Sequence, residues 1–310
     1  MTTSPRFGVA LPQVGIDSPI TSQEVTSFAK RADALGFDGL WTQDQIIGSA
    51  PTLEAIGLLC FVAASTVRVR LGVSVLVLAH RAPVPLAKAL ATLDQLSDGR
   101  LELGIGLGNP NPHEASFGLG QRDRLRRFQD GLGVLKALWA GGVANRASPY
   151  WPLRDTPMSP PPLQRPHPKL WFGGRHPKAL ARAVAQGNGW MGAGSSSLAQ
   201  FAEQVVLVDQ ALQDAGRDRA SFEIAKRVYL AIDDDETRAE RRLKTWFKAY
   251  YGNADLASAV CVWGTANKVR DAVADVLASG ADMVLLNPVF DHADHLETLA
   301  ELFSVGPRIA

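Results

Sequence analysis

The residues most suited to chemistry stand in short polar or glycine-rich segments, each directly after an apolar run. Three of them, Asp44, His80 and Glu114, carry carboxylate or imidazole groups, the usual proton donors and acceptors of enzymes. Each also has a structural alternative, since Asp44 could cap a helix or pair with a cation, His80 could be a hydrogen-bonded rim residue, and Glu114 could support its loop. The pattern therefore predicts acid–base chemistry and leaves open which residue carries it.

The segment WFGGRHP (Trp171–Pro177) is the strongest single motif, and a helix is expected directly after it. Gly173 and Gly174 let the backbone approach a ligand closely, while the start of the next helix presents unpaired N–H groups at its positive end. Arg175 adds a guanidinium group that suits phosphate. Ser195, before the following helix, could donate its hydroxyl to the same anion. A tight turn with a helix cap is the alternative to this predicted phosphate site.

Other kinds of site find less support in the sequence. His292 and His295 have the spacing of metal ligands, but no third ligand accompanies them, so no metal site is expected. Neither a G-x-S-x-G motif nor a phosphate-binding Walker loop is present. A net charge of +1 gives no reason to expect nucleic acid or a membrane surface as partner.

The location expected for the chain is the cytoplasm. No apolar signal segment stands at the start, and no apolar run approaches the roughly 18 residues that a membrane span needs. Cys60 and Cys261 lie far apart, each in an apolar run, and are expected to be buried free thiols.

The elements that must position these residues are short runs rich in Val, Ile and Leu, which alternate with stretches of helical periodicity over 310 residues. Nearly continuous apolar runs are typical of parallel strands that are covered on both faces. Eight strands with intervening helices predict a single-domain (β/α)8 barrel over residues 1–310, and an open doubly wound sheet is the alternative. The expected strands are Phe7–Leu11, Phe37–Trp41, Val69–Leu78, Leu101–Leu107, Leu170–Phe172, Gly189–Met191, Phe222–Ile232 and Met283–Leu286.

In such a barrel the loops that follow the strands build the active site, which would bring the residues named above together. A proline-rich insertion, Ala144–Pro168, interrupts the alternation before the fifth strand and cannot be regular helix or central strand. The expected helices are Ser22–Leu35, Thr52–Ala64, Pro83–Leu96, Arg122–Trp139, Pro177–Gln186, Leu198–Ala215, Glu236–Tyr250, Ala266–Ser279 and Leu296–Phe303.

At these residues the chain resembles the bacterial luciferase-like monooxygenase superfamily, whose members use reduced FMN or the deazaflavin coenzyme F420. The resemblance covers almost the whole chain. Its most specific parts are RLGVSVLVLAHRAPVPLAKALATLDQLSDGRLELGIGLG (Arg70–Gly108) and PPLQRPHPKLWFGGRHPKALARAVAQGNGWMGAG (Pro161–Gly194).

The resemblance implies a place for each part of a flavin or deazaflavin. Asp44 would contact the cofactor, and a non-proline cis peptide at Ser74–Val75 would lie behind its ring. The proline-rich insertion would lie over the substrate mouth. Met191 is a further candidate contact, with a core position as its alternative. The ring and ribityl chain would be lined by Gly106 and Gly108, and the phosphate would be held by Gly173, Gly174, Arg175, Gly194 and Ser195.

One residue departs from the pattern of the superfamily. Deazaflavin-dependent members that oxidise sugars or alcohols typically have a histidine directly after the strand-two aspartate, whereas this chain has Gln45. An amide cannot accept a proton near neutral pH. Asp44, His80 or Glu114 would therefore have to serve as the base, or the substrate needs none.

Three functions follow from the resemblance. The leading hypothesis is a coenzyme F420-dependent oxidoreductase that moves hydride between the deazaflavin and a small organic substrate, with the cofactor carrying the redox chemistry. The alternatives are a two-component monooxygenase that receives reduced FMN from a separate reductase and a non-catalytic flavin-binding protein. A homodimer through the early helices is also expected, since Leu53–Ala64 is apolar on nearly every side.

Overall fold

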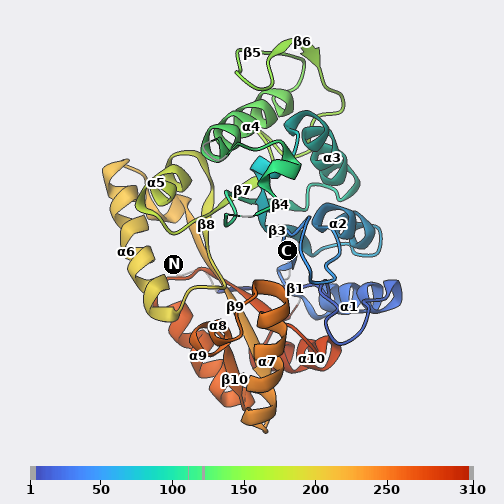
Figure 1. Cartoon of the computed structure of the whole chain (residues 1–310), viewed down its shortest axis with the longest axis vertical. Coiled ribbons are helices and arrows are strands. Elements are labelled where there is room, and N and C mark those ends of the chain that lie inside the picture. Colours follow the sequence, from blue (N-terminus) through green and yellow to red (C-terminus); the bar gives the residue numbers. More distant parts are fainter. Residues whose placement is uncertain (1–4, 111, 121–122, 307–310) are drawn as a thin grey trace.

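Eight parallel strands close into a barrel in the computed structural model, which describes residues 5–110, 112–120 and 123–306 (Figure 1). The order around the barrel is β1-β2-β3-β4-β7-β8-β9-β11, and β11 pairs with β1 to complete the circle. The predicted barrel is therefore confirmed, and the open sheet is excluded. The strands are β1 (Arg6–Ala10), β2 (Gly39–Thr42), β3 (Arg70–Val77), β4 (Leu101–Gly106), β7 (Lys169–Gly173), β8 (Gly189–Gly192), β9 (Glu223–Ile232) and β11 (Met283–Pro288).

Helices surround the barrel and begin and end at residues suited to those positions (Figure 1). The first helix, for example, starts where the Thr21 hydroxyl accepts from the Glu24 N–H, and it stops at Gly36, whose φ is 94°. Arg122, the predicted start of the fourth helix, lies outside the described residues. The helices are α1 (Ser22–Leu35), α2 (Ala55–Ala63), α3 (Pro83–Leu96), α4 (Arg124–Trp139), α5 (Pro177–Gln186), α6 (Leu198–Asp214), α7 (Glu236–Tyr251), α8 (Asp255–Val260), α9 (Ala266–Ala278) and α10 (His292–Leu302).

Large side chains fill the barrel interior. Trp41 and Trp171 meet edge to face at 6.2 Å between ring centroids, and Met191 packs in the same cluster. A Cβ added at Gly72 would stand 2.3 Å from the Trp41 ring, so only glycine leaves room for this packing. The interior is thus a packed core, which leaves the carboxyl ends of the strands as the place for a ligand.

The proline-rich insertion forms an antiparallel hairpin of β5 (Val143–Arg146) and β6 (Leu153–Pro157), away from the barrel (Figure 1). Arg146 pairs with Asp130 of α4 at 3.2 Å, and Leu153 is buried. The hairpin therefore packs on α4. This agrees with the expectation that the segment holds neither a regular helix nor a central strand.

The exposure of the two cysteines and the lengths of the helices bear on the predicted cytoplasmic location. Cys60 is exposed and Cys261 is half-buried, so the prediction of two buried thiols is wrong. The apolar run around Cys60 folds as α2, which leaves the cysteine on the uncovered side of the helix. In the described ranges no helix has the length and apolar character to cross a membrane.

Candidate cofactor site

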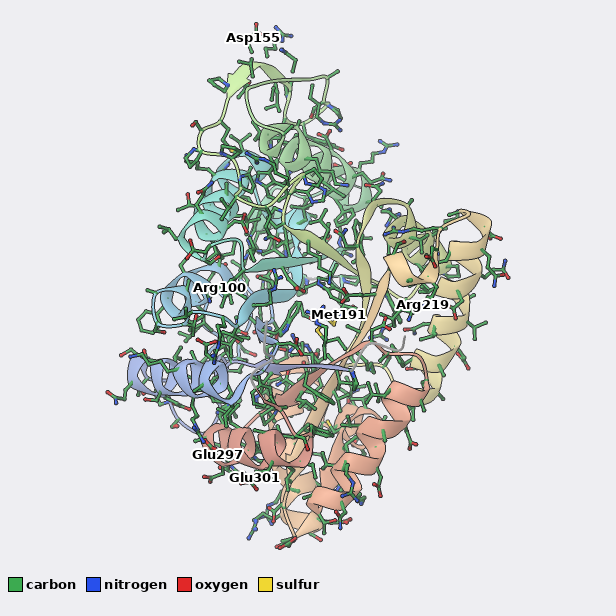
Figure 2. The ribbon with its side chains drawn as sticks, turned by 180° about the vertical axis from the view of Figure 1, so that it is seen from behind. Arg100, Asp155, Met191, Arg219, Glu297 and Glu301 are labelled. Carbon is green, nitrogen blue, oxygen red and sulfur yellow. The ribbon has the colours of Figure 1, made fainter. Side chains whose placement is uncertain are left out.

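A cavity of about 930 Å³ lies at the carboxyl ends of β2, β3, β4, β7 and β8, and the end of α7 closes one side. It combines residues that are far apart in the sequence, as expected from the barrel. Met191, at the centre of Figure 2, is one of them. The predicted site residues that line it are Asp44, Ser74, Val75, His80, Gly106, Gly108, Gly173, Gly174, Arg175, Met191, Gly194 and Ser195.

Two neighbouring loops form the end of the cavity that suits an anion. The Arg175 guanidinium donates to the Ser195 hydroxyl and thereby joins the loop after β7 to the loop after β8. Helix α5 begins two residues after Arg175, at Pro177, with His176 as its N-cap, and it directs the positive end of its dipole toward this loop. Ser196 and Ser197 are used elsewhere, since Ser196 donates to the Ala193 carbonyl at 2.7 Å and Ser197 caps α6.

Lys226, on β9, supports this loop from behind. Its ammonium group donates to the Ser196 carbonyl at 2.8 Å and also to the Ala193 carbonyl. Burial, together with the nearby charges of Arg175 and Arg227, lowers the pKa of Lys226 to about 7. The side chain is buried and thus acts on the shape and potential of the anion end without lining the cavity.

The cavity also has a flat wall, at Val75 of β3. The Ser74–Val75 peptide is cis, as predicted. Val75 stands against two glycines, because an added Cβ would lie 2.6 Å from its Cγ2 atom at Gly106 and 2.9 Å from that atom at Gly173. The absence of side chains at these positions leaves backbone and one valine to receive a planar group.

A buried cation forms the floor below this wall. Arg227 donates to the Ser74 carbonyl at 3.0 Å, to the Gln43 side chain at 3.2 Å and to the side chain of Asn287. Within the described chain no carboxylate pairs with Arg227, so its charge is balanced by dipoles alone. Arg227 and Lys226 were not among the residues predicted from the sequence. The signal that could have revealed them is a pair of adjacent charged residues inside Ile224–Ile232, a run that is otherwise uncharged.

Asp44 lies in the cavity wall, but its carboxylate is engaged on both oxygens. Arg81 donates to them at 2.6 and 2.8 Å, and the Val77 N–H donates at 2.7 Å. The Asp44 side chain is only 2% exposed. Of the roles considered for this aspartate, the geometry favours the ion-paired one, and Asp44 is poorly placed to act as a base.

His80, unlike Asp44, has a polar atom without a hydrogen-bond partner in the described part of the chain. Its ring stacks on Phe117 at 4.2 Å, and its Nε2 atom is buried with no hydrogen-bond partner among the described residues. Burial lowers the pKa of His80 below 6.5, against the opposing charge of Asp44, so the imidazole is neutral at neutral pH. His80 is therefore a lining residue whose Nε2 atom is committed to no other described residue.

The structure also shows where Glu114, Gln45 and the proline-rich insertion lie relative to the cavity. Glu114 is absent from the cavity wall and pairs with Arg124 at 2.9 Å, so the structure does not bring it to the site. Gln45 lines the cavity and accepts from the Thr52 hydroxyl at 3.0 Å. None of the residues 144–168 lines the cavity, so the prediction that the insertion covers the substrate mouth is wrong. The insertion packs instead on α4 and α3, where Gln95 donates to the Pro161 carbonyl.

The family model described as luciferase-like monooxygenase matches residues 5–283, which is most of the chain. The chain belongs to the luciferase-like monooxygenase family. The predicted family is therefore confirmed. Its match to this family includes every strand that contributes to the cavity wall.

Curated relatives of this luciferase-like chain include a phthiodiolone/phenolphthiodiolone dimycocerosates ketoreductase from Mycobacterium sp. (strain JLS), 33% identical over 187 residues. That match covers 60% of this chain and 49% of the ketoreductase, so the chain spans about half the length of this relative. An F420-dependent glucose-6-phosphate dehydrogenase from Kineococcus radiotolerans is 28% identical over 234 residues, with 72% of this chain and 68% of that enzyme covered.

Solved structures share the fold of this luciferase-like barrel. Monooxygenase RslO1 from Streptomyces bottropensis superimposes with a TM-score of 0.79 and 24% identity, covering 96% of this chain and 97% of that one. An F420-dependent secondary alcohol dehydrogenase, solved with an F420-acetone adduct, gives a TM-score of 0.84 at 17% identity and covers 98% and 99%. At these identities the likeness concerns the fold.

Proposed function

We propose that this chain is a coenzyme F420-dependent oxidoreductase that transfers hydride between the deazaflavin and a small organic substrate. The observation that carries the proposal is a single cavity with an anion end at Arg175 and Ser195, a flat end at Val75, and an uncommitted imidazole at His80. The similarity to an F420-dependent dehydrogenase over 72% of the chain supports the choice of cofactor.

The residues present fit such a group. Arg175, Ser195 and the start of α5 would hold the phosphate, and the wall of Val75, Gly106 and Gly173 would receive the ring. When bound there, the coenzyme supplies a hydride donor or acceptor. Both glycines lie so close to Val75 that a side chain at either position would collide with it, which supports a wall made of backbone and one valine.

Arg227 would tune the ring end electrostatically. Its positive charge is buried beneath the wall and has no carboxylate partner within the described residues, so it favours groups that bear negative charge beside it. Hydrogen bonds to the Ser74 and Thr42 carbonyls fix the guanidinium in place, and it does not need to reorganise when a ligand arrives.

His80 would hold the proton that must accompany hydride transfer at a carbonyl or hydroxyl carbon. In oxidation the neutral Nε2 atom accepts the hydroxyl proton, and in the reverse direction the imidazolium returns a proton to the substrate oxygen. A buried, neutral imidazole without another partner among the described residues suits the oxidative direction. His80 would thus accept the proton that the Gln45 amide cannot accept.

The experiment is a fluorescence titration of the apo protein with coenzyme F420 and, separately, with FMN. We expect F420 to bind in the micromolar range and at least tenfold more tightly than FMN. Arg175→Met should weaken F420 binding about tenfold or more, because a charge-assisted contact to phosphate is lost. Arg126→Met, at an exposed arginine of α4, is the matched control.

Two results would contradict the proposal. Tight quenching by FMN with none by F420 would indicate the reduced-flavin monooxygenase instead. Binding of F420 without any change in its absorbance, across alcohol and carbonyl substrates in both redox directions, would indicate a non-catalytic binding protein.

A further inference from the structure

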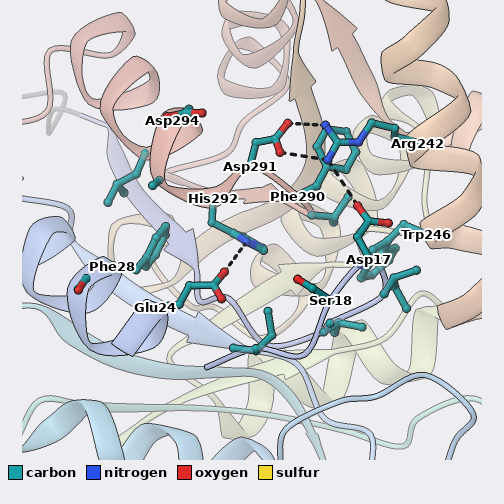
Figure 3. A pocket seen from close by; sticks show the side chains of 18 of the residues that line it. Asp17, Ser18, Glu24, Phe28, Arg242, Trp246, Phe290, Asp291, His292 and Asp294 are labelled. Carbon is teal, nitrogen blue, oxygen red and sulfur yellow. Dashed lines mark hydrogen bonds and ion pairs between the residues drawn. The ribbon is translucent and has the colours of Figure 1, made fainter. Parts of the chain in front are cut away.

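A second cavity, of about 570 Å³, lies between the loop after β1, helices α1 and α7, and the start of α10 (Figure 3). It shares no lining residue with the cofactor cavity. The small space between the two has a volume of about 10 Å³, close to that of one water molecule. A ligand in the second cavity would therefore occupy a site of its own.

The walls of this cavity are largely apolar. Phe28 of α1 and Trp246 of α7 contribute ring surface (Figure 3), and Leu296 of α10 contributes aliphatic surface from a third helix. The volume lies within the range of small-molecule sites, which are typically apolar with a few polar groups that orient the ligand.

The charges around this apolar wall do not balance. Arg31 binds Glu297 through two contacts of 2.5 and 2.6 Å, and Arg242 binds Asp291. Within the described chain no lysine or arginine pairs with Glu24 or Asp294. The lining residues comprise two cations, Arg31 and Arg242, and five carboxylates, Asp17, Glu24, Asp291, Asp294 and Glu297.

A buried imidazole lies beside one of these carboxylates. His292 is the first residue of α10, its side chain is 10% exposed, and its ring points into the cavity toward Glu24 (Figure 3). The distance from its Nδ1 atom to Glu24 Oε1 is 3.6 Å, which is too long for a hydrogen bond. Burial and the neighbouring His295 lower the pKa of His292 to about 4, so it places no positive charge opposite Glu24.

These residues do not suit a metal ion. In the part of the chain that is described, no three His, Cys, Asp or Glu side chains converge as metal ligands would. A carboxylate beside a neutral imidazole, next to aromatic faces, is instead the environment that a protonated amine prefers.

We infer that this cavity binds a small organic amine, whose ammonium group lies between the Glu24 carboxylate and the His292 imidazole and whose apolar body packs on Phe28 and Trp246. The ammonium donates to both side chains and so supplies the partners that the protein does not. Asp294 adds to the negative potential at the same cavity.

The test measures binding of three probes of the same shape to the full chain by saturation-transfer NMR and calorimetry. The probes are 2-phenylethylamine, the neutral 2-phenylethanol and the anionic 3-phenylpropionate. We expect the amine to bind at least tenfold more tightly than the alcohol, and the carboxylate not to bind. Equal binding of amine and alcohol, or no binding of the amine, would overturn the inference.

Variants locate the site. Glu24→Gln and Asp294→Asn should each weaken amine binding, by about tenfold for Glu24, whereas Glu203→Gln on α6 removes an exposed carboxylate far from the cavity and should have no effect. The helix cap at Thr21 uses the Glu24 backbone N–H, so Glu24→Gln retains it. Weakening of the amine by Arg175→Met would place it in the cofactor cavity and would also overturn the inference.

Discussion

Asp44 and His80 lie in the same cavity, yet their surroundings suit them to different tasks. Asp44 accepts three hydrogen bonds from Arg81 and Val77, which commits it to holding two strand ends together. His80 presents a buried Nε2 atom with no partner in the described chain. At the scale of single residues, the uncommitted group is therefore the one to test for proton transfer.

Replacing His80 should slow hydride transfer more than it weakens binding. We expect His80→Gln to lower kcat by roughly a hundredfold, in line with the usual contribution of general acid–base groups, and to leave KM within a few-fold. Steady-state assays with F420 would measure both. His80→Phe keeps the stacking on Phe117, so equal loss in the two variants would attribute the effect to the polar atom.

The environment of His80 also predicts how the activity depends on pH. Because burial lowers the pKa of His80 below 6.5, the neutral imidazole persists to a lower pH than in a free histidine. In the oxidative direction, activity should stay full above that lowered pKa and fall as the pH drops through it, which puts the acidic limb below pH 6.5. An unchanged limb in His80→Gln would show that another group titrates.

At the scale of elements, the anion end depends on how β9 holds the loop after β8. Lys226 binds two carbonyl groups of this loop, at Ala193 and Ser196, and so fixes the place of Ser195. We expect Lys226→Met to raise the Kd for F420 about tenfold with little change in kcat at saturation, because the cation and the loop support are lost together. Lys30→Met, at an exposed lysine of α1, is the control, and an unchanged Kd for Lys226→Met would refute the supporting role.

The elements themselves were largely predictable from the sequence. Burial on both faces makes a barrel strand nearly continuous in apolar residues, so β3 was expected at Val69–Leu78 and occurs at Arg70–Val77. The short strand β10 (Val262–Gly264), which pairs with β9, has too few residues for a periodic signal and was missed. Helix α10 begins four residues earlier than expected, at His292, because polar residues in its first turn hide the apolar period.

Side-chain partners were less predictable than positions. Strand ends place Asp44 and His80 at the cavity, but the pairing of Asp44 with Arg81 depends on the register of β2 against β3. Arg227 reaches the Ser74 carbonyl across the barrel, a contact between residues 153 positions apart. Local patterns carry no information on such contacts.

At the scale of the whole molecule, α7 separates two cavities of different character. The last turn of α7 lines the cofactor cavity, whereas Arg242 and Trp246 of the same helix line the second cavity. The outer surface also carries exposed apolar side chains near α2, including Leu53 at 40% and Phe61 at 46% exposure. This surface is the part of the molecule where we expect a second copy to bind.

A substitution on the exposed apolar surface near α2 tests the expected homodimer. Light scattering of the purified chain should give the mass of a dimer, and Phe61→Glu should give a monomer, because a carboxylate would be buried without a partner. Val206→Glu changes an exposed apolar residue of α6 and should leave the mass unchanged. A monomeric mass for the unaltered chain would contradict the expectation.

The central claim is that one cavity receives the whole cofactor, with its phosphate at the loops after β7 and β8 and its ring against β3. A crystal structure of the chain with coenzyme F420 tests this most directly. We predict phosphate oxygens within about 3 Å of the Arg175 guanidinium and the Ser195 hydroxyl, and the ring in contact with Val75. A phosphate bound elsewhere, or a ring that does not touch the Ser74–Val75 backbone, would contradict the account.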